Sequence, residues 1–347
     1  METDINLWLV GGGLVLGATF GFLAQRSRFC VVAAVSNYVL MRDKRQLDAY
    51  LAAVAVAVAG TAILEFSDWV QVAQSAFRRP ALNWAGALGG GLMFGVGAMM
   101  AGGCASRTLV RSAEGNIGAL VTLIAFALAG MATLFGVLDP VRGWLSSSAS
   151  FHLQSSDASV ASLLAVPQWT IPSLVVAACL IVIALHAKRQ PNWGLVILGA
   201  SIGLVITTGW WITGVAGQDG FAETPPSSLS VAGPLARGAV YLTMGQPTGS
   251  LFALSLIPGM LLGALGSALS SKSFRWIAPA GERVGAYVGG GVLMGIGAVF
   301  AGGCNVGQGL TGISSVSIHS FIAVAGILIG MLFSLWLLQR QCTKTTT

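Results

Sequence analysis

Nine long apolar segments follow one another along the chain, and they leave it very few possible folds. They cover residues 6–24, 47–66, 82–101, 117–138, 169–187, 192–209, 250–270, 284–301 and 317–338. Each is close to the length of about 20 residues that an α-helix needs to cross a bilayer. Only 9% of the residues are charged, against about 25% in an average soluble domain. The sequence therefore predicts an all-α polytopic membrane protein with about nine transmembrane helices.

The basic residues between the apolar segments predict the orientation of the chain. After nine crossings, four basic clusters would lie on the same side: residues 42–45, 188–189, 272–283 and 340–344. Because cytoplasmic loops carry an excess of Lys and Arg, we expect the N-terminus outside and the C-terminus inside, with Arg78 and Arg79 as exceptions. Short basic clusters of this kind do not indicate a nucleic-acid partner. Residues 1–10 contain Glu2 and Asp4 but no basic residue, which is not typical of a cleavable signal peptide.

An internal repeat at an offset of 200 residues predicts the arrangement of these helices. GGGLMFGVGAMMAGGC at 89–104 matches GGGVLMGIGAVFAGGC at 289–304, with ten identical positions of 16. A weaker match pairs residues 16–23 with 198–205. We therefore expect an N-terminal repeat at 1–140, a loop and connecting helix at 141–191, and a C-terminal repeat at 192–347. An odd number of crossings between the copies makes them inverted repeats, an architecture in which transporters place substrate near the membrane midplane.

Each copy of the strong match ends in Gly-Gly-Cys, and this ending is the main candidate for a functional site. Paired glycines leave the helical conformation easily, and exposed successive N–H groups form a concave site for anions. Broken backbone at membrane depth is tolerated inside protein or along a water path. The sequence therefore predicts an anion site near the midplane. It would contain Cys104 and Cys304, with the N–H groups of Gly102, Gly103, Gly302 and Gly303.

The remaining cysteines and the nearby polar residues are less distinctive. Cys30 follows the first segment, and the stretch aligned with it in the second copy, 207–212, has no cysteine. Cys179 is interpreted as a small packing residue, and Cys342 lies in the polar tail. No CxxC pair indicates a metal site. Arg26, Arg28 and Arg107 would either attract an anion or anchor loops. Residues 210–249 lie outside in this scheme, and part of them is expected to re-enter the membrane.

Three motifs together resemble the YeeE/YedE family of sulfur transporters over nearly the whole chain. They are RSRFC at 26–30, AGGC at 101–104, and AGGC-x-x-GQGLTG at 301–312. The resemblance implies an hourglass-shaped helical membrane protein of a bacterial inner membrane that takes up thiosulfate without a cofactor. It implies conduction by Cys30, Cys104 and Cys304, and its third motif contains Asn305 and Gln308. Some members act with a small cytoplasmic TusA-type sulfurtransferase, and others are linked to selenium metabolism.

These features suggest a relay in which thiosulfate passes from one neutral thiol to the next. A thiol is a weak, soft donor, and weak binding at several sites suits conduction. Two other kinds of protein remain open. A membrane thiol–disulfide oxidoreductase would need a reactive cysteine pair, and a membrane scaffold without transport would need none. A permease for a selenium compound or another sulfur compound is a further alternative.

Overall fold

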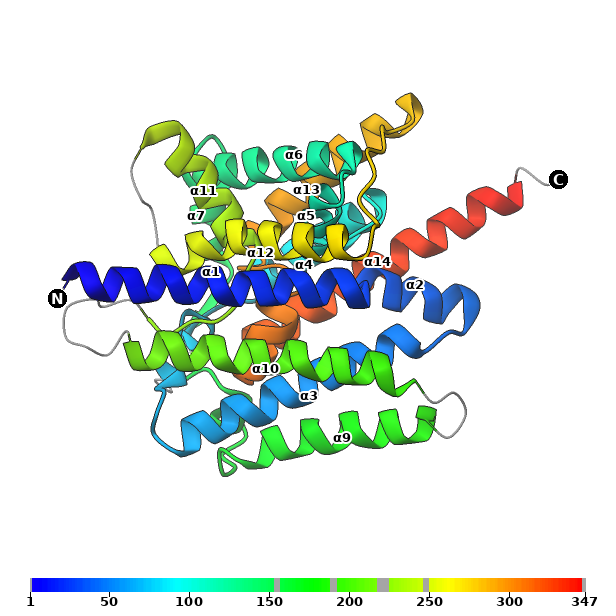
Figure 1. Ribbon diagram of the computed structural model, residues 1–347. Helices are drawn as coiled ribbons and strands as arrows, with labels where there is room; N and C mark the ends of the chain where they lie inside the picture. The colour runs from blue at the N-terminus through cyan, green and yellow to red at the C-terminus, as the bar shows by residue number, and fades with distance from the viewer. Residues whose placement is uncertain (1, 153–156, 188–191, 217–224, 246–249, 345–347) are drawn as a thin grey trace.

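The computed structural model describes residues 2–152, 157–187, 192–216, 225–245 and 250–344, and most of them are helical (Figure 1). Within these ranges, nine segments are long and apolar enough to span a membrane. They are Trp8–Met41, Arg45–Phe66, Trp84–Ala113, Ile117–Phe135, Thr170–Ala187, Trp193–Val215, Leu251–Ser270, Gly281–Phe300 and Ile318–Arg340. Each overlaps one of the nine predicted segments, which confirms the all-α polytopic fold.

Three of the spanning regions are interrupted, and short helices follow the interruptions. The N-terminal region contains α1 (Glu2–Ser27), α2 (Val31–Met41), α3 (Arg45–Phe66), α4 (Trp84–Met100), α5 (Ala105–Ala113) and α6 (Ile117–Phe135). The C-terminal region contains α9 (Thr170–Ala187), α10 (Trp193–Ala216), α11 (Ala232–Met244), α12 (Leu251–Ser270), α13 (Gly281–Phe300), η3 (Gly307–Gly312) and α14 (Ile318–Lys344). The breaks after α1, α4 and α13 carry Cys30, Cys104 and Cys304.

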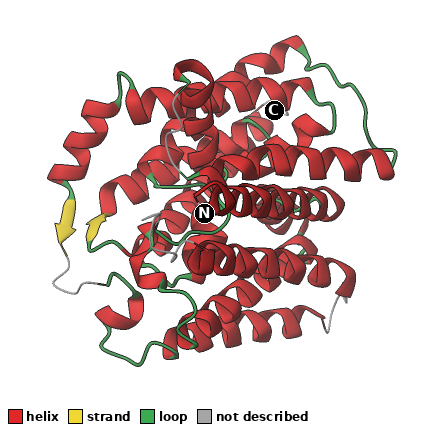
Figure 2. Cartoon of the chain, turned by 60° about the vertical axis from the view of Figure 1, so that its left-hand side comes forward, coloured by secondary structure: helices red, strands yellow, loops and turns green. Residues whose placement is uncertain are grey.

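The segment between α6 and α9 contains small elements at the edge of the helical mass. These are α7 (Asp139–Ser148), β2 (Ser150–His152) and α8 (Val160–Leu163), and β2 pairs with β1 (Ala81–Asn83) as an antiparallel ribbon. Figure 2 shows the two strands at this edge. Two single turns, η1 (Val72–Gln74) and η2 (Ala76–Arg78), connect α3 to β1. None of these elements is long enough to span a membrane, as the sequence predicted for residues 139–168.

The most extensive helix contacts join the two predicted repeats to each other. In the first, α1 packs along α12 and α4 along α14; in the second, α10 packs along α3 and α13 along α6. At the centre, α4 crosses α13. The matched pairs support a division into repeats at 1–140 and 192–347, which stays a prediction.

Glycines allow the central crossing of α4 and α13. A Cβ added to Gly97 would lie 2.7 Å from the carbonyl oxygen of Gly290, and a Cβ on Gly290 would lie 2.7 Å from that of Gly97. No side chain fits at that distance, so the two backbones approach as closely as small-residue contacts in membranes permit. Glycines in this region therefore serve close helix packing.

The chain direction agrees with an inverted arrangement. Figure 1 shows α1 and α10 running in opposite directions, and α1 begins on the side opposite to the end of α14. The basic residues Lys188 and Arg189 lie outside the described residues. Which side faces the cytoplasm therefore stays a prediction.

Candidate functional site

The three breaks that carry the cysteines have the same backbone structure. A long helix ends, one residue takes a left-handed conformation, and the cysteine follows two positions later. The left-handed residues are Arg28 (φ 51°), Gly102 (φ 70°) and Gly302 (φ 70°). Each turn is a Schellman motif, closed by backbone hydrogen bonds from Phe29 to Ala24 (3.1 Å), Gly103 to Ala98 (2.9 Å) and Gly303 to Ala298 (2.8 Å).

This geometry corrects the predicted role of the glycine N–H groups. The N–H groups of Gly102, Gly103, Gly302 and Gly303 all donate to carbonyl oxygens of the preceding helical turn, at 2.8–3.2 Å. They are therefore not exposed for an anion, and the prediction that they line the site with free donors is wrong. The glycines end the helices and thereby place the cysteines.

The available donors belong instead to the helices that begin at the cysteines. Cys30 is the N-cap of α2, Cys104 is the N-cap of α5, and Cys304 lies three residues before η3, a stretch of π-helix. The first N–H groups of a helix have no partner within it, and this end carries partial positive charge. Each sulfur interacts with the backbone N–H three residues later: Ala33 for Cys30, Arg107 for Cys104 and Gly307 for Cys304.

A fourth helix begins at the same place. The backbone N–H groups of Val231 and Ala232, at the start of α11, interact with the sulfur of Cys304. Part of residues 210–249 therefore returns to the protein centre, as predicted. Val231 precedes α11 as Cys30 precedes α2, whereas residues 207–212 lie inside α10. Val231, and not the stretch 207–212, therefore corresponds to Cys30 in the structure. The second copy has no cysteine at this corresponding position, as expected from the sequence.

The three cysteines come together in the protein interior. Cys30, Cys104 and Cys304 are 8%, 2% and 1% exposed, and all three are free thiols. The thiols of Cys30 and Cys104 interact directly, and Cys304 lies near Cys104. Cys104 and Cys304 thus lie close together and buried, while their place at the membrane midplane and their part in conduction stay predictions.

Two polar side chains accompany Cys104. Ser106 Oγ lies 3.3 Å from its sulfur. The carboxamide of Asn305 lies beside the same sulfur, and Asn305 is only 4% exposed. No described atom accepts a hydrogen bond from its Nδ2. The Asn305 amide is therefore a buried donor that points at the thiols. Ser106 was not predicted as a site residue, because the sequence motif ends at Cys104.

The other predicted polar residues have protein partners or lie at the surface. Gln308 donates to Ala301 O (2.9 Å) and accepts from Ser320 Oγ (2.6 Å). Arg107 Nη1 lies 3.5 Å from Glu114 Oε1. Arg26 and Arg28 are exposed. The contacts of Gln308 and Arg107 favour structural roles for these two residues, and Arg26 and Arg28 lie outside the buried cysteine cluster.

Tyr50 connects α3 to the cysteine cluster. Its hydroxyl donates to Gly309 O in η3 at 3.0 Å. The side chain lies near Cys104 and Cys304, and its ring stacks on Phe29 with centroids 5.8 Å apart. Tyr50 therefore fixes η3 against α3 next to the thiols.

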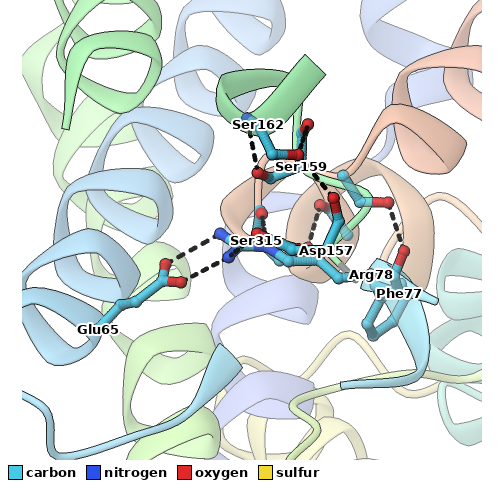
Figure 3. A network of polar contacts seen from close by, with 9 residues as sticks. Glu65, Phe77, Arg78, Asp157, Ser159, Ser162 and Ser315 are labelled. Atoms are coloured by element: carbon cyan, nitrogen blue, oxygen red, sulfur yellow. Dashed lines mark hydrogen bonds and ion pairs between the residues drawn. The ribbon is translucent and has the colours of Figure 1, made fainter. Parts of the chain in front are cut away.

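A buried ion-pair network holds the segment that follows η3 (Figure 3). Arg78 is 4% exposed. Its guanidinium donates twice to Glu65, at 2.5 and 2.9 Å, and once to Ser315 O, at 2.6 Å. Asp157 Oδ2 lies 3.5 Å from the same guanidinium. Arg78, an exception to the predicted charge distribution, is thus a buried structural cation rather than a solvated loop residue.

Comparison with known proteins identifies the family of this chain. The family model described as "Sulphur transport" matches residues 26–333, which include all three central cysteines. The chain belongs to the sulphur transport family. Two known proteins are similar to this chain over nearly its full length. The thiosulfate transporter TsuA of Spirochaeta thermophila is 29% identical over 96% of this chain and 100% of its own length. TsuA of Escherichia coli is 25% identical over 97% of this chain and 98% of its own length.

A more distant member of the sulphur transport family matches a part of the chain. The probable transporter YedE of Escherichia coli is 31% identical over 117 residues, which are 33% of this chain and 27% of that protein. The resemblance to the YeeE/YedE family drawn from the three motifs is therefore confirmed.

Proposed function

We propose that this protein is a permease that takes up thiosulfate across a bacterial inner membrane, with its N-terminus in the periplasm and its C-terminus in the cytoplasm. The observation that carries the proposal is the meeting of three free, buried thiols at the first turns of four helices. Full-length similarity to two proteins named thiosulfate transporter supports it.

The chemistry of the site suits a small dianion with one soft atom. An unpaired charge in hydrocarbon is prohibitively costly, so the path has to supply donors. The starts of α2, α5, α11 and η3 supply positive dipole ends and backbone N–H groups. The thiols of Cys30, Cys104 and Cys304 supply weak donors for the terminal sulfur of thiosulfate. The glycine pairs act by ending α4 and α13 at this point.

Passage through the site involves no chemical step on the anion, so we do not propose an enzyme. The anion moves between the thiols because weak donors allow it to leave each position. On the cytoplasmic side, we propose a TusA-type sulfurtransferase as the acceptor of the imported sulfur.

Growth of a bacterium without sulfate uptake, supplied with thiosulfate as its sole sulfur source, tests the proposed function. Expression of this protein should restore growth and the uptake of radiolabelled thiosulfate. Parallel cultures with sulfite and selenite separate the other sulfur and selenium substrates. Absence of thiosulfate uptake, with the protein present in the membrane, would reject thiosulfate as the substrate.

One observation favours a thiol–disulfide oxidoreductase as a second candidate. Cys30 and Cys104 are 74 positions apart in the sequence, yet their thiols interact, and such a pair can in principle form a disulfide. Both thiols are buried, which opposes the access that exchange with a partner protein requires. Thiol trapping in intact cells that shows a Cys30–Cys104 disulfide cycling with the redox state would favour this candidate.

Replacement of Asn305 by alanine should separate transport from stability. Its Nδ2 is buried without an acceptor, a state that costs about 1–3 kcal/mol. Asn305→Ala should therefore leave thermal stability equal or higher, while thiosulfate uptake falls about tenfold because a donor to the anion is lost. Alanine is compatible with the backbone at position 305, because Ala105 occupies the matching position in the N-terminal repeat.

Gln308→Ala provides the comparison for Asn305→Ala. Gln308 has partners on both sides of its amide, so its loss should lower the stability by about 1–3 kcal/mol. Thermal unfolding of the two purified variants distinguishes the cases. A drop in stability for Asn305→Ala equal to that for Gln308→Ala, with normal uptake, would mean that Asn305 is structural.

A further inference from the structure

We propose that Asp48 and His186 form a proton-binding pair that couples the entry of the anion to the entry of protons. This inference rests on the proposed function, because it concerns the driving force of the same permease. It assigns a role to the extra helix α9, which lies outside both predicted repeats.

The charge of the anion creates the need for coupling. A membrane potential acts on each charge with about 2.3 kcal/mol per 100 mV. At about 100 mV, negative inside, a dianion that enters alone would equilibrate roughly 10³-fold more dilute inside than outside. Each proton that accompanies the anion removes one charge from the transfer, and two protons make it electroneutral. A permease that accumulates thiosulfate against the potential therefore needs a co-transported positive charge, and a proton-binding group in the protein can supply it.

Asp48 and His186 have the geometry of such a group. His186 Nδ1 lies 2.6 Å from Asp48 Oδ1, and the two side chains are 16% and 7% exposed. The pair joins α3 to α9 across 138 positions of sequence. An ionisable side chain within a membrane span is costly and is a functional candidate by default.

The described elements around this pair carry few other ionisable side chains. The elements packed on α3 are α2, α9, α10 and η3. Among the described residues, α10 and η3 contain no ionisable side chain, α2 contributes Tyr38, with Arg42 as its C-cap, and α9 contributes Cys179 and His186. The ionisable residues on α3 and just before it, besides Asp48, are Asp43, Lys44, Arg45, Tyr50 and Glu65. Arg45 pairs with Asp43 at 3.1 Å, and Glu65 pairs with Arg78. Of the described elements packed on α3, α9 supplies the imidazole partner of Asp48.

The pair is also close in sequence to the thiol cluster. Asp48 lies two residues before Tyr50, whose hydroxyl holds Gly309 in η3 and whose ring lies near Cys104 and Cys304. A change of charge at Asp48 therefore acts on the helix that fixes η3. Through this contact, the protonation of the pair is linked to the shape of the anion site.

Two transport assays on the full-length protein in liposomes test the inference. In counterflow, liposomes loaded with thiosulfate exchange it for labelled thiosulfate at equal pH and without a potential. In driven uptake, an acidic outside medium should drive accumulation of labelled thiosulfate.

We expect the wild type to perform both counterflow and driven uptake. An internal pH dye should report acidification of the liposome interior only when thiosulfate is added. Asp48→Asn and His186→Gln should retain counterflow but lose at least about tenfold of the driven accumulation. Asp43→Asn, which alters the more exposed pair with Arg45 just before α3, should behave as wild type.

The assays separate failure of the coupling from failure of the proposed function. Absence of counterflow in the wild type rejects the permease itself. Counterflow without any thiosulfate-dependent proton entry in the wild type overturns the coupling, and this result does not depend on the folding of any variant. Two results for the variants also overturn the assignment of coupling to this pair. One is driven accumulation that is undiminished in both variants. The other is a folded variant that loses both counterflow and driven accumulation.

Discussion

Cys104→Ala should take up thiosulfate about 10- to 150-fold more slowly than the wild type, because a hydrogen bond to a charged group contributes about 1.5–3 kcal/mol. Cys104 is expected to have the largest effect of the three cysteines, since it interacts with Cys30 and lies near Cys304, Ser106 and Asn305. Cys104→Ser should lose less, because the hydroxyl still donates but lacks a soft sulfur. Initial rates of labelled thiosulfate uptake in cells with matched protein levels give the comparison.

Cys179→Ala is the matched control for this prediction. Cys179 is a buried free cysteine on α9, outside the three helix breaks, so its replacement should leave uptake within twofold of the wild type. Normal uptake in the Ala and Ser variants of all three central cysteines would eliminate the thiol relay. The permease itself would still be tested by the growth assay.

Glu65→Gln should destabilise the protein by about 3–5 kcal/mol, the effect expected when one partner of a buried ion pair is removed. The guanidinium of Arg78 would keep its charge, and a neutral amide would replace its bidentate carboxylate. Thermal unfolding of the purified protein in detergent measures the loss.

A triple variant and a surface pair make the result for Glu65 interpretable. Glu65→Gln combined with Arg78→Met and Asp157→Asn removes the buried cation together with both carboxylates beside it, and should recover much of the stability. Asp139→Asn breaks the ion pair between Asp139 and Arg142, whose side chains are 46% and 38% exposed, respectively. This change should lower the stability by less than about 1 kcal/mol. Equal losses in Glu65→Gln and Asp139→Asn would show that the network of Figure 3 contributes no more than a surface pair.

The membrane fold could be predicted from the sequence because it depends on local composition. All nine spans were found, since a helix in hydrocarbon needs about 20 apolar residues in succession. The repeat at 89–104 and 289–304 also singled out Cys104 and Cys304, two of the three cysteines that lie together in the structure. These features are written in consecutive residues, so no knowledge of distant contacts was needed.

The details of the site depend on contacts that the sequence does not record. A glycine pair in the sequence is compatible with an anion-binding turn and with a Schellman motif. The backbone hydrogen bonds of Gly103 and Gly303 show that the structure has the Schellman motif. Arg28 holds the left-handed position that glycine holds in the other two breaks, which concealed the third copy of the motif. The contact between Cys30 and Cys104 and the place of Val231 depend on how α2, α5 and α11 converge.

The exchange of helix partners between the two halves has a consequence for synthesis on the ribosome. The main neighbour of α1 is α12, and residues 28–250 separate them in the chain. At about 5–20 residues per second, translation of that stretch takes tens of seconds. During this time the glycine-lined face of α1 has only lipid or the insertion machinery against it, so the biogenesis of the N-terminal half waits for the last helices to be made.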